Sequence, residues 1–366
     1  MTKKLRVNVP GAAYDVIVGA GVMGDCGRLL SGLTDARTVA LVSDETVAKQ
    51  YSTQADIAFA QAGFRVMSLT VPAGETSKNW ALAGDLLEEF ARLGLGRTDV
   101  VVALGGGVIG DLAGFAAAVY LRGVSFMQMP TTLLAMVDSS VGGKTGVDLS
   151  AGKNLAGAFK QPLLVLADTQ ALASLPDEQW RSGIAEVVKS AVLDGEAFLS
   201  WVEEQTEALN ARDGEVVEEV VARSMAFKSG IVARDEREEG PRECLNYGHT
   251  LGHALEKVLG YGTITHGEAV AEGMRFAARV AVDVGQADAT FVKRQDHLLD
   301  ALGLRPLRAL AEPSALIAAM RSDKKARGGS VRMVLADGPG LWRCVAVDDG
   351  VLDAHLEAWA ETKREG

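Results

Sequence analysis

The segment Asp99–Leu104 constrains the fold most strongly, because one aspartate is followed by a continuous apolar run, Val100–Leu104, that stops at three glycines. A short apolar run bounded by a turn signal is typical of a strand that is buried on both faces in a parallel sheet. The glycines Gly105–Gly107 lead directly into an apolar helical pattern. The chain therefore contains a strand–turn–helix unit, which is the building block of α/β domains.

The remainder of the first half alternates strand and helix signals. Pro10-Gly11 separates two strand-like runs near the N-terminus and predicts an opening hairpin. Strands that alternate with helices indicate a parallel sheet with crossover helices. We expect strands at Val7–Val9, Tyr14–Val18, Val39–Ser43, Phe64–Leu69, Val124–Met129 and Leu163–Ala167, and a helix at Trp80–Leu93.

The pattern of the chain changes near residues 175–178. Strand signals become rare after Leu175, and a helical repeat of about 3.6 residues continues to Met320. One late hairpin is expected, with strands at Val331–Leu335 and Leu341–Val347 around Asp337-Gly-Pro-Gly. We therefore predict an α/β domain with a parallel sheet over residues 1–177 and a mostly α-helical domain over residues 178–366.

Composition argues against several classes of function. The chain of 366 residues has a formal net charge of −11, and an acidic chain repels phosphate polymers, so nucleic acid is not an expected partner. No apolar run approaches the ~20 residues that cross a bilayer. The charged start Met1-Thr-Lys-Lys has no apolar core behind it, so we expect no signal peptide. Cys26, Cys244 and Cys344 lie far apart, which fits a reducing cytosol. We expect a cytoplasmic protein without a membrane partner, and a small anionic ligand remains compatible with this composition.

The glycine loop has two interpretations. Residues Gly105–Gly110 match the spacing G-x-G-x-x-G, in which bare backbone lets N–H groups approach a pyrophosphate at a helix N-terminus. The alternative is an ordinary tight turn, because the usual ribose-binding acid about 20 residues further on is missing. Asp44, at the end of an earlier strand, is either a ribose ligand or a helix cap. The later run Gly142–Thr145 resembles a P-loop, but Asp138 stands where that loop needs glycine, so an NTPase is not expected.

Histidines concentrate in one window of the second half, since three of the chain's five lie within residues 249–266. His249 and His253 are spaced i, i+4 on one helix face, and His266 opens a later segment. Such a cluster suits a divalent metal completed by a carboxylate, and spacing alone nominates His249 and His253 as the ligand pair. Glu186 is the best carboxylate, and with Lys189 it forms either a buried site or a solvated stripe. Ordinary core or surface histidines are the alternative.

Several basic residues lie beside glycine, serine or apolar residues rather than in surface helices of alternating charge. Each alone is typical of a solvated charge, but together with a metal and glycine loops they indicate an anion pocket. These residues are Arg122, Lys144, Lys153, Lys189, Lys228, Arg242, Lys324 and Lys325.

Separated segments spanning about residues 44–335 resemble the motifs of the 3-dehydroquinate synthase family, and they occur in the family's order. Agreement across so many segments makes the resemblance specific. The segments are Pro72–Lys78, Gly105–Asp111, Pro130–Lys144, Gly152–Asn154, Ala185–Lys189, Leu245–His253, His266–Glu268 and Asp323–Lys325.

The resemblance implies a Rossmann-like NAD-binding domain at residues 1–177 and a helical metal- and substrate-binding domain at residues 178–366. It implies zinc, or cobalt in its place, on Glu186, His249 and His266, and it moves His253 to the substrate shell. The residues implied to border NAD are Asp44, Glu75, Lys78, Gly106, Gly107, Val108, Ile109, Gly110, Asp111, Thr131, Thr132, Lys144, Lys153 and Ser174. Those implied to line the substrate site and supply its catalytic groups are Asp138, Lys144, Lys153, Asn154, Lys189, Lys228, Arg242, Asn246, His253 and Lys324. Arg122 is implied to reach the neighbouring subunit's site in a homodimer.

The implied reaction converts 3-deoxy-D-arabino-heptulosonate 7-phosphate to 3-dehydroquinate and phosphate, a step of the shikimate pathway to aromatic amino acids. NAD takes a hydride from C5 and returns it after phosphate elimination, zinc polarises the C5 oxygen, and ring opening and an intramolecular aldol step follow. The substrate's carboxylate and phosphate account for the basic residues.

Other functions remain as alternatives. Asp148-Leu149 and Ser190 depart from the family's usual residues, which leaves open a sister cyclase acting on sedoheptulose 7-phosphate or an amino analogue. Lys228 and Arg242 favour the acid substrate. A metal-dependent polyol dehydrogenase and a catalytically inactive ligand-binding protein are the further alternatives.

Overall fold

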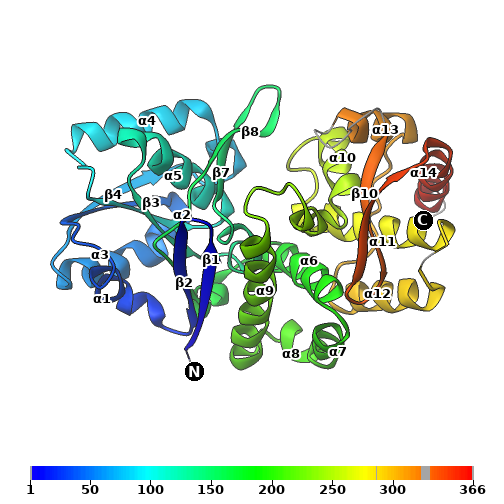
Figure 1. The fold of residues 1–366 in the computed structure, drawn as a ribbon, viewed down its shortest axis with the longest axis horizontal. Coiled ribbons are helices and arrows are strands. Elements are labelled where there is room, and N and C mark those ends of the chain that lie inside the picture. The colour runs from blue at the N-terminus through cyan, green and yellow to red at the C-terminus, as the bar shows by residue number, and fades with distance from the viewer. Residues whose placement is uncertain (1, 286, 323–329, 365–366) are drawn as a thin grey trace. The chain divides into compact units, whose positions relative to one another are not determined.

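The computed structural model describes residues 2–285, 287–322 and 330–364, so Lys324 and Lys325 lie outside the described residues. By their contacts the residues form two compact units (Figure 1). Unit 1 comprises Met1–Leu175 and Val217–Glu236, and unit 2 comprises Pro176–Val216 and Arg237–Gly366. Among the described residues, no helix is both long and apolar enough to cross a membrane.

Unit 1 is built on a seven-stranded sheet in the order β1-β2-β9-β6-β5-β3-β4. The opening strands pair as an antiparallel hairpin, with Val7 opposite Tyr14, and the other neighbours pair in parallel. Both features confirm the sequence predictions. The strands are β1 Lys3–Val9, β2 Ala12–Gly19, β3 Thr38–Asp44, β4 Arg65–Val71, β5 Val100–Gly105, β6 Ser125–Pro130 and β9 Leu164–Asp168.

Strand β5 shows why this segment is uniformly apolar. Val101 and Ala103 face one core, whereas Val100, Val102 and Leu104 face the other. The first face is covered by α4 (Trp80–Arg92) and α5 (Gly107–Val119), and the second by α1 (Cys26–Ser31) and α3 (Thr53–Gln61) (Figure 1). A strand buried on both sides has no polar face, so the two-residue alternation of a half-buried strand is absent.

Helical segments connect these strands. The helices of unit 1 are α1 Cys26–Ser31, α2 Glu45–Val47, α3 Thr53–Gln61, α4 Trp80–Arg92, α5 Gly107–Val119 and α9 Gly214–Arg234, the last beginning in unit 2. Shorter 3₁₀ turns are η1 Val22–Asp25, η3 Glu75–Ser77, η4 Tyr120–Arg122 and η6 Thr169–Ser174, and π-helical turns are η2 Ala48–Ser52 and η5 Ala135–Ser139.

A second hairpin in unit 1 was not predicted from the sequence. Strands β7 Lys144–Leu149 and β8 Gly152–Phe159 pair antiparallel, with Gly146 opposite Gly157. A Cβ on Gly157 would lie 2.5 Å from the Thr145 carbonyl oxygen, so the strands approach closely. The glycines that permit this pairing also conceal it, because they lower strand propensity.

Unit 2 is mostly helical, as predicted, with one late hairpin. Strands β10 Val331–Gly338 and β11 Leu341–Val347 pair antiparallel, which confirms the expected hairpin. The helices are α6 Asp177–Asp194, α7 Glu196–Glu204, α8 Thr206–Asn210, α10 His249–Leu259, α11 His266–Asp283, α12 Ala289–Ala301, α13 Pro313–Ser322 and α14 Asp349–Arg364, with the 3₁₀ turn η7 Pro241–Asn246.

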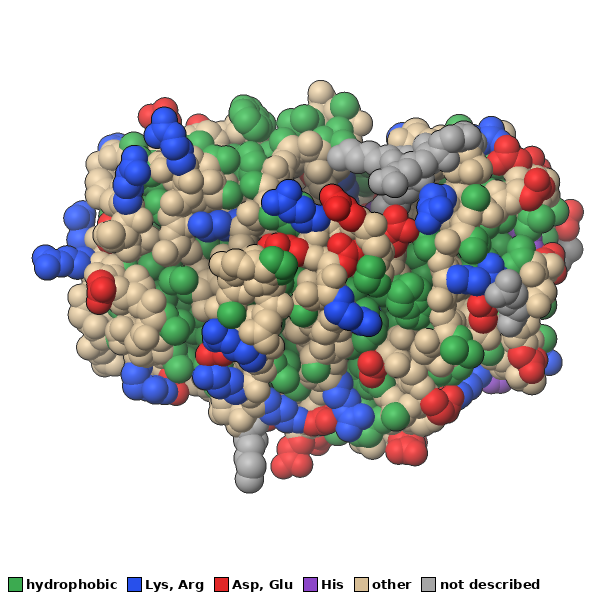
Figure 2. All heavy atoms as spheres, viewed as in Figure 1, with side chains coloured by type: hydrophobic (Ala, Val, Ile, Leu, Met, Phe, Trp, Pro, Cys, Tyr) green, Lys and Arg blue, Asp and Glu red, His purple; other side chains and the backbone are tan. Residues whose placement is uncertain are grey.

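Surface charge is mixed on the face drawn in Figure 2. Lysine and arginine side chains alternate with aspartate and glutamate across this face and do not merge into one basic field. The predicted concentration of basic residues around an anion therefore has to be sought in local clusters.

Candidate functional site

The glycine loop lies at a switch point of the parallel sheet. Strands β3 and β5 are neighbours, but the chain continues from β3 outward to β4 and from β5 in the opposite direction to β6. Ligands of open α/β sheets bind outside the carboxyl ends of strands at such a point. Gly106 precedes the first turn of α5 and no side chain caps this helix, so its N–H groups are available to a phosphate.

Thr131 adds a buried polar group beside this loop. Its backbone N–H donates to the Gly105 carbonyl at 3.0 Å, so it stands next to the end of β5. Its hydroxyl oxygen is buried and has no hydrogen-bond partner among the described residues. A buried hydroxyl without a partner is costly, so this one fits a ligand that supplies a hydrogen bond. The residues at this end of β5 therefore fit a dinucleotide.

Other predicted dinucleotide residues are engaged within unit 1. Asp44 is a helix cap, because its Oδ1 accepts from the N–H groups of Thr46 and Val47 at 2.9 and 3.0 Å. Ser174 shares a hydrogen bond of 2.7 Å with the hydroxyl of Tyr51, and Thr132 Oγ1 accepts from the Ala135 N–H at 3.2 Å. Asp44 thus acts as a helix cap in this structure, and its other carboxylate oxygen, Oδ2, is the one that a ribose contact would use.

Lys78 and Asp111 form an ion pair in unit 1. The Nζ of Lys78 lies 2.5 Å from Oδ2 of Asp111, and the lysine side chain is buried. Burial opposes charge on the lysine, but Asp111 outweighs it and raises the pKa of Lys78. Nearby, Lys153 Nζ lies 3.4 Å from Glu75 Oε1. The structure thus brings together four of the predicted dinucleotide residues.

The predicted substrate residues of unit 1 include a second lysine–aspartate pair. Lys228 Nζ lies 2.6 Å from Asp138 Oδ1 and donates to the Asp138 carbonyl at 2.5 Å. Asn154 has a positive φ of 55°, and its N–H donates to Asp148 at 2.7 Å. Lys144 is exposed at the start of β7, and Arg122 is exposed at the end of η4.

The candidate metal centre lies within unit 2. Glu186 is fully buried in α6, His249 begins α10, and His266 begins α11. Oε1 of Glu186 lies 3.6 Å from Nε2 of His249 and 3.4 Å from Nε2 of His266. These three residues form a group whose donor atoms lie within 4.8 Å of one another. One carboxylate and two imidazoles are a donor set that suits zinc or a similar divalent metal.

The surroundings of Glu186 support a ligand role. Neither carboxylate oxygen accepts a hydrogen bond from a described residue, although both are buried. Lys189, one turn along α6 and almost fully buried, forms an ion pair with it. The predicted alternative of a solvated stripe is therefore wrong, because both side chains lie in the interior. A buried carboxylate surrounded by imidazole nitrogens fits a cation.

The pKa values of the two candidate ligand histidines are shifted in opposite directions. Burial, with Lys189 and the other two histidines nearby, holds the pKa of His249 well below its ordinary value. Burial also opposes protonation of His266, but the carboxylates of Glu186 and Glu256 outweigh it and raise the pKa to about 9. The neutral ring of His249 therefore offers a lone pair to a metal.

Close backbone contacts fix the helices that carry these ligands. A Cβ on Gly273 of α11 would lie 1.8 Å from the carbonyl oxygen of Gly248, the residue before His249. A Cβ on Gly267, the residue after His266, would lie 2.3 Å from the Cα of Ser182 in α6. Only glycine fits at both contacts, so the ligand positions follow from the way α6, α10 and α11 pack.

The remaining predicted residues of unit 2 lie on α10 and η7. Arg242 is buried, and the Asn246 amide donates to Glu238 Oε1 at 2.5 Å. His253 is exposed, with its ring centroid 5.3 Å from that of His249 and 6.2 Å from that of His266. Spacing alone nominated His249 and His253 as the ligand pair, but the group that contains Glu186 includes His249 and His266 and not His253.

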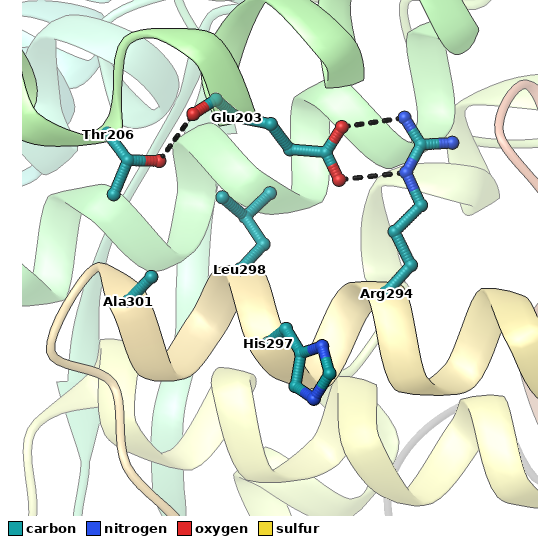
Figure 3. A pocket seen from close by; sticks show the side chains of 6 residues that line it. All are labelled: Glu203, Thr206, Arg294, His297, Leu298 and Ala301. Carbon is teal, nitrogen blue, oxygen red and sulfur yellow. Dashed lines mark hydrogen bonds and ion pairs between the residues drawn. The ribbon is translucent and has the colours of Figure 1, made fainter.

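A different hollow of unit 2 contains none of the predicted site residues. It has a volume of about 270 Å³, and Figure 3 shows Glu203 and Arg294 facing each other at its side. Arg294 Nε and Nη2 donate to the two Glu203 oxygens at 2.8 and 2.7 Å, so its charge is already matched. The hollow is lined by Glu203, Thr206, Arg294, His297, Leu298 and Ala301.

Sequence reasoning missed two acidic residues at the site. Glu256 Oε2 lies 3.3 Å from Nδ1 of His266, and Glu238 accepts from Asn246. Glu256 follows His249 by seven residues and His253 by three, so helical spacing already put it on their face. No comparable signal marks Glu238.

Comparisons with known proteins agree over most of the chain. Residues 68–182 match the family model for 3-dehydroquinate synthase N-terminal, and residues 183–326 match the model for 3-dehydroquinate synthase C-terminal. A 3-dehydroquinate synthase of Symbiobacterium thermophilum is 48% identical over 330 residues, which cover 89% of this chain and 92% of the relative.

Two solved structures resemble the whole chain. A 2-deoxy-scyllo-inosose synthase, in complex with carbaglucose-6-phosphate, NAD⁺ and Co²⁺, has a TM-score of 0.88 at 26% identity and covers 97% of this chain and 100% of its own. A 2-epi-5-epi-valiolone synthase from Streptomyces hygroscopicus subsp. jinggangensis, with NAD⁺ and Zn²⁺ bound, has a TM-score of 0.86 at 25% identity and covers 97% and 99%.

Proposed function

Because the chain belongs to the 3-dehydroquinate synthase family, we propose that it converts 3-deoxy-D-arabino-heptulosonate 7-phosphate to 3-dehydroquinate and phosphate. It is thus a lyase that breaks a carbon–oxygen bond and serves aromatic amino acid biosynthesis through the shikimate pathway. The observation that carries this proposal is the convergence of Glu186, His249 and His266 on one point in a chain that also has a glycine loop at a sheet switch point.

The proposed cofactors are NAD and a divalent metal, zinc or cobalt. When bound, NAD would accept and return a hydride, and the metal would polarise the substrate oxygen at the same carbon. We assign NAD to residues 1–177, and metal and most substrate contacts to residues 178–366. Glu186, His249 and His266 would hold the metal, and the predicted residues from Asp44 to Ser174 would border NAD.

Basic residues are proposed to bind the two anionic ends of the substrate. Buried Arg242 suits a carboxylate, because its guanidinium donates in a planar fork. Lys228 forms an ion pair with Asp138, which orients its ammonium group. Lys189 forms an ion pair with Glu186, one of the proposed metal ligands. Asn246, His253, Lys144, Lys153 and Asn154 complete the proposed substrate residues within the described part of the chain.

A homodimer is part of the proposal. Unit 1 exposes apolar side chains on elements that contact one another around α5, namely α4, η4, β7 and β8. A second copy of this chain is the proposed cover, with Arg122 beside Leu121 reaching the partner's site. The exposed fractions are 61% for Trp80, 41% for Val119, 37% for Leu121, 41% for Leu149, 38% for Leu155 and 45% for Phe159. We also propose the cytoplasm as its location, which is consistent with the absence of a disulfide among Cys26, Cys244 and Cys344 in the described part of the chain.

The alternative is a sister cyclase that acts on a sugar phosphate without a carboxylate. It is favoured by the similarity to the two cyclase structures, but their identities of 25–26% are well below the 48% shared with the dehydroquinate synthase relative.

Phosphate release separates these functions. The purified protein, supplied with NAD and Zn²⁺, is assayed with the heptulosonate phosphate and with sedoheptulose 7-phosphate, each with and without chelator. We expect release from the heptulosonate only, without NADH accumulation, and loss of release with chelator. Preference for sedoheptulose 7-phosphate would establish the sister cyclase, and steady NADH from a simple alcohol would indicate a dehydrogenase.

Arg242 provides a sharper test of the substrate carboxylate. Arg242→Met should raise KM for the heptulosonate by roughly a hundredfold, because a buried charge loses its partner. Arg279→Met is the matched control, since Arg279 is a partly exposed arginine paired with Asp296 at 2.6 Å. Equal KM values for the two variants would remove Arg242 from the substrate site.

A further inference from the structure

We propose that Glu256 is a positioning residue that orients His266 toward the metal, an inference that rests on the proposed metal centre. The Oε2 of Glu256 lies 3.3 Å from Nδ1 of His266, on the opposite side of the ring from the Glu186 carboxylate. Glu256 therefore contacts the His266 ring at the nitrogen that faces away from Glu186.

In both proposed ligand histidines, Nδ1 faces an oxygen acceptor and Nε2 faces Glu186. Nδ1 of His249 lies 3.1 Å from the carbonyl oxygen of Tyr247, and Nδ1 of His266 faces the carboxylate of Glu256. In both rings the other nitrogen, Nε2, is the one nearer to Glu186 Oε1. An acceptor at Nδ1 keeps the proton there, so the Nε2 lone pair is available to a metal.

Burial argues that Glu256 is present for this contact. Only 5% of it is exposed, on a helix whose other buried positions include Leu251, Ala254 and Leu255. A carboxylate in such surroundings costs free energy unless polar partners compensate it. Packing alone would be satisfied by leucine, whereas orienting an imidazole requires an acceptor.

A competing role is a second metal position. His253, Glu256 and His266 also form a group whose donor atoms lie within 4.8 Å of one another. His266 is common to both groups, so one ring would have to offer Nδ1 to one metal and Nε2 to the other. The positioning role needs only the ordinary neutral ring, and metal stoichiometry distinguishes the two.

The test measures Co²⁺ affinity of the full-length protein by competition with a chromophoric chelator. Loss of such an outer acceptor lowers metal affinity by about 10–100-fold. We expect Glu256→Leu to reach this range, with Glu256→Gln between it and wild type because the amide oxygen still accepts. The visible Co²⁺ spectrum should shift in both variants, since the ring can rotate. Thermal melting in the presence of a chelator shows which variants fold. Glu256→Asp replaces the other two variants in the affinity measurement if they do not fold.

Glu272→Gln is the matched control. Glu272 is also a buried glutamate of unit 2, but its carboxylate accepts from Trp359 Nε1 at 2.6 Å and from the Leu307 N–H at 3.0 Å. This variant should lose stability and keep wild-type Co²⁺ affinity and spectrum.

Three results would overturn the inference. They are Co²⁺ affinities of the Glu256 variants within twofold of wild type, losses no larger than that of Glu272→Gln, or two Co²⁺ per wild-type chain with one lost on replacing Glu256. If wild type binds Co²⁺ and His249→Ala does not, the proposed metal centre stands even when the Glu256 variants bind normally.

Discussion

Two lysine–carboxylate pairs, Lys78–Asp111 in unit 1 and Lys189–Glu186 in unit 2, have similar composition and different surroundings. The Asp111 side chain is 20% exposed and the Glu186 side chain 0%. Two imidazole nitrogens point at Glu186, whereas the described ion-pair partner of Asp111 is its lysine. A buried lysine–carboxylate pair is therefore not by itself a metal site. The convergence of two imidazole nitrogens on the carboxylate makes the difference.

The largest effect is expected from His249→Ala, which removes one of those donors. Metal binding should be lost and phosphate release should fall at least about a thousandfold, because the metal supplies several kcal/mol of transition-state stabilisation. The melting temperature in chelator should change little. Metal content and phosphate release are measured against His297→Ala, an exposed histidine of α12. Activity retained in His249→Ala would show that the ligand assignment is wrong.

Lys78→Met removes the Lys78–Asp111 ion pair and should lower the free energy of unfolding. Removing one partner of a buried ion pair costs about 3 kcal/mol, since the remaining carboxylate is left uncompensated. Urea unfolding should show this loss, while metal content stays unchanged. Lys4→Met is the control, because its side chain is 64% exposed and its pair with Asp15 is solvated. A loss no greater than that of the control would place Lys78 among surface charges.

Gly273→Ala should lower both the free energy of unfolding and the affinity for metal, because a Cβ there collides with the Gly248 carbonyl oxygen. We expect a loss of about 2 kcal/mol in the free energy of unfolding, as for other overpacked positions, together with weaker Co²⁺ binding. Gly230→Ala on α9 is matched to it, since a Cβ at Gly230 meets nothing within 4 Å. Unchanged Co²⁺ affinity in Gly273→Ala would separate helix packing from ligand geometry.

The smallest effect is expected at the exposed cluster of Arg294 with Glu196 and Glu203. Arg294, helped by Ser200, lowers the pKa of Glu196 from 4.5 to about 2. A lowered pKa means that the contribution to stability is present above pH 4.5 and disappears as the pH falls toward 2. Arg294→Met should therefore cost less than about 1 kcal/mol at neutral pH, because solvent screens the pair. Unfolding at pH 7 and pH 3 measures whether the difference shrinks.

Sequence patterns predicted elements whose periodicity is set by burial. The expected strand Asp99–Leu104 corresponds to β5, and the two expected hairpins at the ends of the chain are present. The β7–β8 hairpin was missed because its close approach uses glycines, which carry no side-chain pattern. Periodicity reports which face a residue occupies and does not report its partner.

The metal centre illustrates the same limit. Spacing placed His249 and His253 on one face of α10. The position of His266 depends on how α10 packs against α11, and both helices are distant in sequence from α6, which carries Glu186. The family resemblance supplied Glu186, His249 and His266, and the structure brings them together. Glu256 lies on the same helix face and was not predicted. Its sequence position does not distinguish it from a surface acid, because acidic residues on helices are usually solvated.

The glycine contacts at Gly248–Gly273 and Gly267–Ser182 have a consequence for protein engineering. The proposed metal site could not be transferred to another protein by moving Glu186, His249 and His266 alone. His249 and His266 begin two helices whose backbones are in direct contact. Grafting these three side chains onto helices with ordinary spacing would spread the donors too widely. A transplant would have to carry the glycines with the ligands.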